Sequence, residues 1–347
     1  MVLGDETHRG ADALRSPFLR WAAAMPTAIQ LPDIARDVLI AVNSQAGVRD
    51  RRAIALELQR YLEDAGLAVT IVSSIDELAD LVPAKLAAGS LRAVVSAGGD
   101  GTLSLIANRT PPGTPLAILP LGTENLLARH LEVTADPQQL CRLIAAGWCV
   151  SIDAGQAGER IFTLMAGCGF DADVVRRLHR HRTGNIHHLS YAKPILDSIR
   201  KYQYPELRVQ YAPVDSDDGE LTAEIAARWV FVVNLPRYAG GLSFAPQASG
   251  TDGLLDICTF KEGSLWSGLV YLSGVMLGQH ESMEDFARAR TRRLRIESAG
   301  QAPYQLDGDP GGDLPVEIRA LPGRLTLLVS PTWAERNGFA VPIAAEE

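Results

Sequence analysis

The amino-acid sequence predicts an α/β N-terminal domain with a parallel sheet, followed by a second domain that is mostly antiparallel β. The length of 347 residues is enough for two domains, since domains commonly have about 100–200 residues. From residue 37 to residue 148, short apolar runs alternate with helical periodicity, which predicts a parallel sheet covered by helices on both faces. Beyond residue 149, β-like runs follow one another with Gly, Pro, Asp and Ser between them, as in antiparallel domains.

The predicted first domain covers residues 36–148 and follows a poorly defined leader at residues 1–35. Its first strand, 38–42, is a continuous apolar run rich in β-branched residues, which is typical of a strand buried on both faces. The helix after it has apolar residues at helical spacing from Ile54 to Ala65 and stops at Gly66. The later elements are expected at strand 69–72, helix 76–88, strand 91–96, helix 102–108, strand 115–119 and a helix through His130.

The predicted second domain covers residues 149–321 and consists mainly of strands. Two helical insertions interrupt them, one at 173–181 with 190–201 and one at 264–277. In the second insertion, apolar residues recur at helical spacing, which predicts that the helix packs into the core. The β-like runs are 161–165, 207–211, 224–234, 254–260 and 294–297. The apolar residues of the second insertion are Leu265, Trp266, Leu269, Leu272, Val275 and Met276.

Composition and charge exclude several classes of protein. The formal net charge is −8, from 33 basic and 41 acidic residues, which argues against broad nucleic-acid binding because that requires a basic surface. The four cysteines contain no C-x-x-C pair, so we expect buried free thiols and a reducing compartment. Asp5 and Glu6 argue against a signal peptide, and the apolar stretch 265–277 is too short to span a bilayer. We therefore expect a soluble or peripheral protein.

A glycine-rich loop, Gly98-Gly99-Asp100-Gly101-Thr102, follows a predicted buried strand and opens a helix. Glycines let the backbone approach a ligand closely, and the first N–H groups of a helix favour an anion. These features predict a phosphate-binding loop, with a tight strand-to-helix turn as the alternative. Asp100 cannot neutralise phosphate, so we expect it to order the loop or to contact Mg²⁺.

A second loop, Pro120 to Arg129, also lies between a buried strand and a helix. Ligands of parallel sheets bind beyond the carboxyl ends of the strands, so two loops at neighbouring strand ends can converge on one ligand. Thr123 and Asn125 lie in this second loop, and Arg129 is four residues after Asn125 on the same helix face.

Together these loops resemble the diacylglycerol kinase catalytic domain, a family that includes bacterial lipid kinases and sphingosine kinases. The resemblance continues downstream in family order, so it covers about residues 37–332. It implies an NAD kinase/diacylglycerol kinase-like fold in which residues 322–347 return to the first domain. The downstream segments are Phe162 to Asp171, Val233-Asn234, Gly240-Gly241, Asp252 to Asp256, and Gln305 to Asp309.

The resemblance also implies a set of ATP and metal contacts. A first loop, Asn43 to Gly47, would contact ATP, although it lacks the family's proline. Asp252 would hold a structural Mg²⁺ together with the flanking positions Ser249 and Leu254. The implied nucleotide contacts are Asn43, Gly47, Ser73, Gly98, Gly99, Asp100, Gly101, Thr102, Thr123 and Asn125.

The candidate catalytic residues are Asp100, Asp307 and Asp309. The family reaction needs a base near the lipid hydroxyl that attacks the γ-phosphorus in line. The segment Asp307-Gly308-Asp309 lies where the family carries Asp-Gly-Glu, so Asp309 is one methylene shorter than the family residue.

By this resemblance the protein is expected to be an ATP- and Mg²⁺-dependent lipid kinase of phospholipid metabolism. Its expected location is the cytoplasm, peripheral to the inner face of the membrane, and a homodimer is compatible with the sequence. The basic run 176–182 is a candidate for contact with the membrane surface. The alternative to core packing for the apolar helix 264–277 is that it lines a groove for lipid tails. Two other functions stay open: a catalytically silent nucleotide- or lipid-binding regulator, and a soluble-substrate kinase of the NAD kinase type.

Overall fold

The computed structural model describes residues 25–42, 48–180, 202–216, 219–238 and 241–342 of the chain. The first domain contains β2 (Asp37–Val42), α1 (Val48–Asp64), β3 (Ala68–Val72), α2 (Ile75–Ala87), β4 (Leu91–Gly98), α3 (Asp100–Arg109), β5 (Pro115–Pro120), α4 (Leu126–His130) and α5 (Pro137–Ala146). The second domain contains β6 (Trp148–Ala157), β7 (Arg160–Phe162), β8 (Met165–Gly169), α6 (Phe170–Arg180), β9 (Leu207–Tyr211), β10 (Ala223–Ala227), β11 (Trp229–Val233), β12 (Leu255–Phe260), α8 (Leu265–Met276), the 3₁₀ turn η4 (His280–Ser282), β13 (Phe286–Thr291), β14 (Arg293–Ser298), β15 (Pro303–Leu306) and β16 (Asp309–Asp313).

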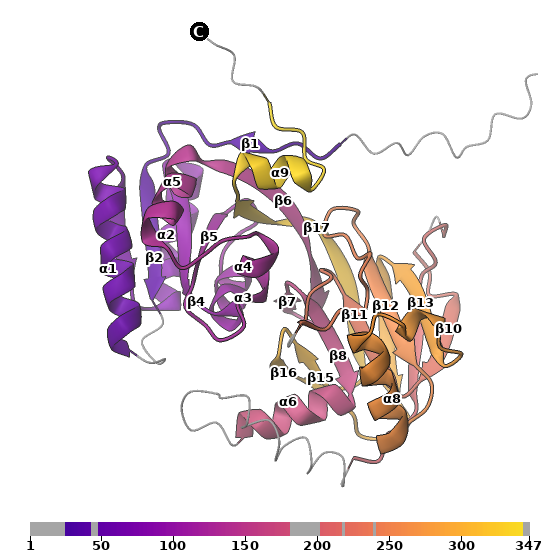
Figure 1. The fold of residues 1–347 in the computed structure, drawn as a ribbon. Helices are drawn as coiled ribbons and strands as arrows, with labels where there is room; N and C mark the ends of the chain where they lie inside the picture. The colour runs from indigo at the N-terminus through magenta and orange to yellow at the C-terminus, as the bar shows by residue number, and fades with distance from the viewer. Residues whose placement is uncertain (1–24, 43–47, 181–201, 217–218, 239–240, 343–347) are drawn as a thin grey trace, which may run out of the picture.

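The first domain is the predicted parallel sheet, with strand order β5-β4-β2-β3. One face packs on α1 and α5 through a cluster that includes Ile40, Leu58 and Ile144, and the other packs on α2, α3 and α4 through a cluster that includes Leu39 and Ile106. Figure 1 shows α1 on one side of the sheet and α3 and α4 on the other. The continuous apolar strands are therefore explained by burial on both faces.

The leader prediction is wrong for residues 27–35, which belong to the first domain. β1 (Ile29–Gln30) pairs antiparallel with the start of β6, and Ala28 is fully buried. Residues 1–24 lie outside the described part of the chain. The two-residue strand was missed because backbone pairing with a distant strand, and not a local apolar pattern, holds it in place.

The second domain is a sandwich of antiparallel strands, as the sequence predicted. One layer is the six-stranded sheet β13-β12-β11-β8-β15-β16, and the other is formed by β10, β9, β14 and β17 (Val316–Leu328). The core between the layers includes Phe162, Val230 and Ile318. All four cysteines are buried and have free thiols, as expected.

The end of the chain joins the two domains. β17 is 13 residues long; it pairs antiparallel with β14 and β6 and, near its end, parallel with β5 of the first domain. The helix α9 (Pro331–Arg336) then packs on the first domain, where the indole N–H of Trp333 donates to the carbonyl of His130 at 2.8 Å. Residues 325–339 thus pack against the first domain. The return of the whole segment 322–347 to this domain stays a prediction.

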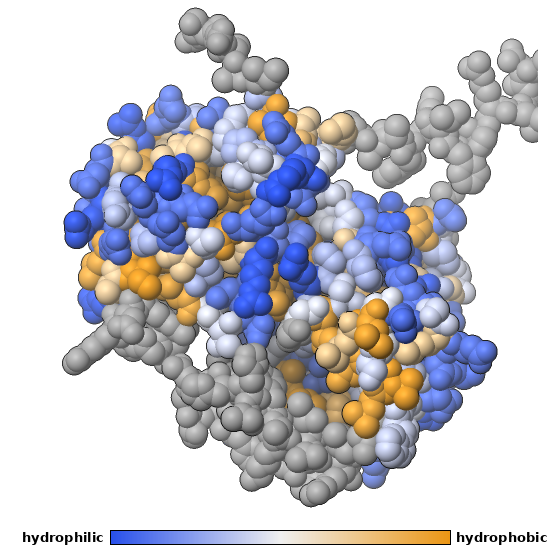
Figure 2. All heavy atoms as spheres, viewed as in Figure 1, coloured by the Kyte–Doolittle hydropathy of each residue, from blue (hydrophilic) through white to orange (hydrophobic). Residues whose placement is uncertain are grey.

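Helix α8 lies on the outer face of the six-stranded sheet, and only one of its faces packs into the core as predicted. Tyr271 and Val275 are buried against aromatic residues of that face, but Trp266 is 76% exposed and Met276 is 72% exposed. Figure 2 shows an apolar surface over α8. Helical spacing indicates that one face of a helix packs against the protein, but it does not show what lies against the other face. None of the described helices has the length and apolar content required to cross a membrane.

Candidate active site

The two glycine loops meet at the carboxyl ends of the neighbouring strands β4 and β5. The N–H of Leu121 donates to the carbonyl of Gly98 at 2.9 Å, so the loops are joined directly by their backbones. Helix α3 begins at Asp100 with Gly99 as its N-cap, two residues earlier than the sequence predicted. The glycine loop is therefore already the first turn of the helix.

Glycines 99 and 122 are the contact between the two loops. A Cβ atom added at Gly122 would lie 2.5 Å from the Cα atom of Gly99, and one added at Gly99 would lie 3.1 Å from the Cα of Gly122. Because the obstacle is backbone, a side chain at Gly122 would push the two loops apart. Both glycines are therefore required by the close approach of the two loops, as in a shared ligand cradle.

The second loop is closed by the side chain of Asn125, which has a positive φ of 49°. Its amide oxygen accepts from the N–H of Gly122, and its amide nitrogen donates to the carbonyl of the same residue, each at 2.9 Å. Left-handed backbone is tolerated by Asn better than by most residues. Asn125 thus shapes the loop, in addition to its predicted role as a nucleotide contact.

Asp100 locks the two loops together. Its carboxylate accepts from the N–H groups of Leu126 and Leu127, at 3.0 and 3.2 Å, so it caps the start of α4 from the neighbouring loop. Burial raises the pKa of Asp100, the nearby Glu124 raises it further, and the N–H donors oppose the rise. Loop ordering, one of the two roles expected for Asp100, is therefore visible in its contacts.

The first turn of α3 presents backbone donors at this junction. Within the described residues, the N–H groups of Gly99 and Gly101 have no hydrogen-bond acceptor. Thr123 is exposed, Thr102 is buried with its hydroxyl against Gly98, and Ser73 is exposed beyond the end of β3, the edge strand. Two predicted contacts, Asn43 and Gly47, lie outside the described residues.

The second domain contributes the segment Asp307 to Asp309, whose two carboxylates have different surroundings. The Asp307 carboxylate accepts from the N–H groups of Thr163, Leu164 and Met165, at 2.6 to 3.0 Å, and from the Thr163 hydroxyl at 3.0 Å. Burial raises the pKa of Asp307 to about 6, and these four donors oppose the rise. Its oxygens are therefore committed to holding the segment between β7 and β8.

Asp309 faces the phosphate loop across the domain boundary. A Cβ atom added at Gly101 would lie 3.3 Å from Oδ2 of Asp309. In the described part of the chain, no hydrogen bond or ion pair engages this carboxylate. The structure thus brings Asp309 to the glycine loop with its oxygens available.

Two contacts fix helix α3 against the second domain and so set this distance. The amide of Asn108 exchanges hydrogen bonds with the backbone of Ile161 in β7, at 2.7 and 3.0 Å. At the end of α3, the Arg324 guanidinium donates to the carbonyls of Ala107 and Thr110, at 2.6 and 2.7 Å. Cationic donors at a helix C-terminus satisfy its free carbonyls.

A buried polar cluster behind Asp309 was missed by the sequence analysis. The Gln305 side-chain amide donates to Asp171 at 3.0 Å and lies 3.3 Å from the Tyr238 hydroxyl, and its carbonyl oxygen accepts from the N–H of Gly308 at 2.7 Å. Burial raises the pKa of Asp171 to about 6. The cluster therefore supports the turn that carries Asp309. The motif containing Asp171 was noticed in the sequence, but nothing local indicated its partners.

The three predicted metal ligands lie in one turn, but their polar groups already have partners. Asp252 accepts from the N–H of Leu254 at 3.0 Å and forms an ion pair with Arg290, and the Ser249 hydroxyl lies 3.1 Å from that of Thr251. Among the described residues, no group of three or more His, Cys, Asp or Glu residues could hold a metal. A cation at Asp252 would therefore have to displace Arg290 and take backbone carbonyls as its other ligands.

Asp153, which the sequence analysis missed, anchors this turn. Its buried carboxylate accepts from the N–H groups of Gly253 and Gly323, at 2.7 and 2.8 Å. Burial raises the pKa of Asp153, and the charge of Asp252 raises it further. Two acidic groups thus lie near each other behind the domain boundary.

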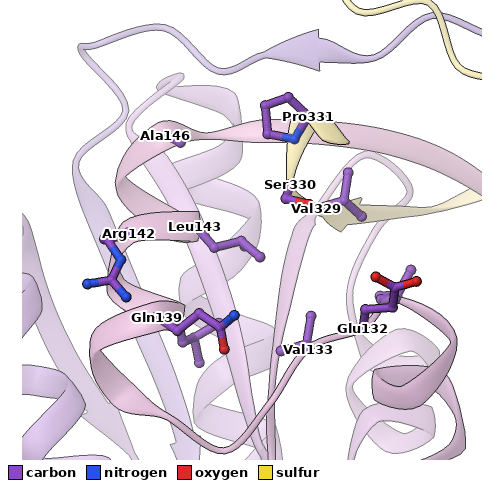
Figure 3. A pocket seen from close by; sticks show the side chains of 11 residues that line it. Glu132, Val133, Gln139, Arg142, Leu143, Ala146, Val329, Ser330 and Pro331 are labelled. Carbon is purple, nitrogen blue, oxygen red and sulfur yellow. The ribbon is translucent and has the colours of Figure 1, made fainter. Parts of the chain in front are cut away.

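A cavity of about 250 Å³ lies elsewhere, in the first domain (Figure 3). Its walls come from α5, the turn after α4 and the segment before α9, and they are mostly apolar. The carboxylate of Glu132 at its edge is paired with Arg336. Neither the glycine loops nor Asp309 line it, so it is separate from the candidate active site.

Comparisons with known proteins identify both halves of the chain. Residues 37–157 match the family described as "Diacylglycerol kinase catalytic domain", and residues 165–329 match "YegS C-terminal NAD kinase beta sandwich-like domain". A diacylglycerol kinase of Mycobacterium tuberculosis is 32% identical over 258 residues, which cover 72% of this chain and 80% of that protein. A diacylglycerol kinase of Bacillus subtilis is 25% identical over 249 residues, which cover 70% and 79%.

A solved structure shares the fold. The crystal structure of a diacylglycerol kinase from Bacillus anthracis str. Sterne superposes with a TM-score of 0.63 at 23% sequence identity. The match covers 86% of this chain and 98% of that one. The predicted fold, a parallel α/β domain followed by an antiparallel β domain, is confirmed.

Proposed function

Because this chain belongs to the diacylglycerol kinase family, we propose that it is a lipid kinase that transfers the γ-phosphoryl group of ATP to a lipid hydroxyl, most simply that of diacylglycerol. The observation that carries the proposal is the position of Asp309. An available carboxylate lies against the first turn of α3, where phosphate would bind, and it comes from the opposite domain. Phosphoryl transfer depends mainly on positioning and electrostatics, and a site built at a domain boundary can supply both.

We propose that the joined glycine loops bind the ATP phosphates. The close approach of Gly99 and Gly122 leaves no side chain in the cradle, and the N–H groups of Gly99 and Gly101 are available donors among the described residues. The N-terminus of α3 favours anions. Thr102, Thr123 and Asn125 would complete the contacts, and Ser73, Asn43 and Gly47 stay predicted contacts of the nucleotide.

Asp309 is the proposed general base, and Asp307 positions it. A base must have a free oxygen within reach of the attacking hydroxyl. The oxygens of Asp307 have four donors, whereas those of Asp309 have none in the described chain. Asp309 would accept the proton of the lipid hydroxyl, and Asp100 would keep the two phosphate-binding loops together.

Bound Mg²⁺ would neutralise phosphate charge, as metals do in phosphoryl transfer generally. Near the phosphates, the carboxylate of Asp309 fits such an ion, because it is open and oxygen is the ligand that Mg²⁺ prefers. A second, structural ion at Asp252 with Ser249 and Leu254 fits less well, because Arg290 already occupies that carboxylate. The structural site stays a prediction.

The protein would work at the inner face of the membrane, since its proposed acceptor is a membrane lipid. The prediction of a membrane patch at 176–182 has less support, because part of its positive charge is already paired. Arg176 and Arg177 both form ion pairs with Asp173, and Arg176 also pairs with Asp313. His179 and Arg180 are exposed, and residues 181 and 182 lie outside the described chain. A homodimer stays a prediction.

The test is transfer of labelled γ-phosphate from ATP with Mg²⁺ to lipids in mixed micelles. The panel would contain diacylglycerol, sphingosine, ceramide and an isoprenoid alcohol, with NAD⁺ as a soluble acceptor. Labelled phosphatidic acid from wild-type protein, absent with the Asp100→Ala and Asp309→Ala variants, would support the proposal. ATP binding without any labelled product would favour a silent regulator, and labelled NADP⁺ would favour a soluble-substrate kinase.

A further inference from the structure

We propose that the outer face of α8 docks on a phospholipid surface and brings the active site to its substrate, an inference that rests on the proposed lipid kinase function. The face is formed by Trp266, Leu269, Val270, Leu272, Met276 and the adjacent Leu277, which are 43% to 76% exposed. These six residues are half of the twelve large apolar side chains that lie exposed in the described chain. Figure 2 shows an apolar area over α8.

The inner side of the helix carries two glycines that touch neighbouring side chains, together with the buried Tyr271 and Val275, and its exposed side is formed by large apolar residues. Gly268 packs against Trp229 and Gly274 against Met283, so close that an added Cβ would lie 2.9 and 2.1 Å from them. A helix designed for water would have polar residues on its outer face. Here the glycines let the helix backbone lie close to Trp229 and Met283, and the large apolar side chains of the outer face remain exposed.

Charge and hydrogen bonding favour a lipid surface as the occupant. Residues 263–279 contain no charged side chain. The hydroxyls of Ser264, Ser267 and Ser273 all bond within the helix and its cap. A protein partner would be recognised through about one hydrogen bond per 100–200 Å² of interface. Among its six apolar side chains this face offers only the indole N–H of Trp266, whereas a lipid surface needs none. Helices with exposed Trp and Leu commonly bury about 5–10 Å into the boundary between headgroups and acyl chains.

The inner face of α8 connects to the candidate active site through packed aromatic rings. Tyr271 stacks on Phe260 at 4.5 Å, Phe260 contacts Phe231 at 6.4 Å, and Phe231 stacks on Phe244 at 3.9 Å between ring centroids. Phe244 contacts Tyr238, whose hydroxyl reaches Gln305. Gln305 in turn holds the Asp307–Asp309 turn. A continuous series of side-chain contacts therefore joins α8 to the segment that carries Asp309. Docking of α8 would fix the distance between the Asp309 carboxylate and the lipid surface.

The experiment compares vesicle binding and two kinds of substrate. Two variants remove opposite ends of the face: Trp266→Ser/Val270→Ser and Met276→Ser/Leu277→Ser. A matched control, Leu56→Ser/Val214→Ser, removes exposed apolar side chains that are 44% and 38% exposed and lie elsewhere. Each protein is sedimented with phosphatidylcholine vesicles containing diacylglycerol, and assayed on these vesicles and on dissolved dihexanoylglycerol.

We expect each helix variant to bind vesicles about tenfold or more weakly, since one or two apolar side chains contribute about that much to membrane binding. Activity on vesicles should fall in parallel, while activity on dihexanoylglycerol and the melting temperature stay at wild-type levels. The control should bind as the wild type does. Wild-type protein that ignores vesicles, or helix variants that still bind them, would overturn the proposal.

Two further outcomes are decisive. A wild-type dimer that the helix variants dissociate in sedimentation velocity would assign the face to a second copy of the chain instead. Vesicle binding that depends on α8, in a protein without activity on either substrate, would support docking and reject the kinase function.

Discussion

The two sides of the candidate active site are held in place differently. One side is the pair of glycine loops of the first domain, and the other is the segment 307–309 of the second domain. The glycine loops of the first domain approach each other through backbone atoms, and the carboxylate of Asp100 accepts the hydrogen bonds that join them. The segment 307–309 of the second domain is held by side chains, with Asp307 bound to four donors and Gln305 to a fifth, so that Asp309 stays open. The glycine loops leave room for a ligand against their backbone, and the hydrogen bonds of the segment 307–309 hold the Asp309 carboxylate in place with its oxygens available.

The largest expected effect follows from replacing Asp309, the open carboxylate. Asp309→Asn should lower kcat about 10²–10⁴-fold, the usual range for loss of a general base. The melting temperature should stay unchanged, because the carboxylate has no partner to lose among the described residues. Steady-state kinetics and calorimetry measure the two quantities. Asp313→Asn, on the same hairpin, is the control, and a fully active Asp309→Asn protein would refute the assignment.

Asp307→Asn should chiefly lower the stability of the protein, whereas Asp309→Asn should chiefly lower kcat. An amide offers one acceptor where the carboxylate has two, so buried donors at residues 163–165 lose their partner, at a cost of about 2–4 kcal/mol. Urea denaturation measures this loss. Thr163→Val removes one donor of the four and should cost less. If Asp307→Asn abolishes turnover with full stability while Asp309→Asn does not, the two aspartates exchange their roles.

Gly122→Ala tests the backbone contact on the other side of the site. The added methyl would press on Gly99 and on the Asn125 amide, at 2.5 and 2.6 Å, which should cost about 1–3 kcal/mol of stability. ATP affinity, measured by isothermal titration, should fall because the loops part. Gly300→Ala, where the added atom meets only an ordinary contact at 3.5 Å, is the control. Unaltered ATP affinity would show that the junction does not shape the phosphate site.

The last prediction concerns the pH dependence of the polar cluster of Gln305, Asp171 and Tyr238. The pKa of Asp171 is raised from 3.8 to about 6, so the folded protein keeps a proton that the unfolded chain has released. Its stabilising contribution is fully present below about pH 4 and is lost as pH rises to about 6, with a slope of at most about 1.4 kcal/mol per pH unit. The difference in unfolding free energy between wild type and Asp171→Asn should fall across this window and be flat above it. If the difference in unfolding free energy between the two proteins does not vary with pH, Asp171 is not the group that titrates in this range.

The fold and the phosphate loops could be predicted because their signals are local. Buried parallel strands are continuous apolar runs, and the glycines that open a helix follow them directly. The different roles of Asp307 and Asp309 could not be predicted, because they depend on donors at residues 163–165, more than 140 positions away in the sequence. Asp153 and the partners of Gln305 were missed for the same reason. The exposure of the outer face of α8 was not predicted because helical spacing indicates that one face packs against the protein but not what lies against the other.

The long strand β17 has a mechanical consequence. It runs from the sandwich into the parallel sheet, and β6 pairs with it along both parts. No loose linker is involved, so any opening between the domains must bend a hydrogen-bonded ribbon. The weak point of that ribbon is the irregularity between Leu321 and Leu325, where Gly323 has a positive φ of 60° and its N–H is pinned by Asp153. A change in the angle between the two domains would therefore have to distort the pairing of β6 with β17, and this irregularity is where that pairing is already interrupted.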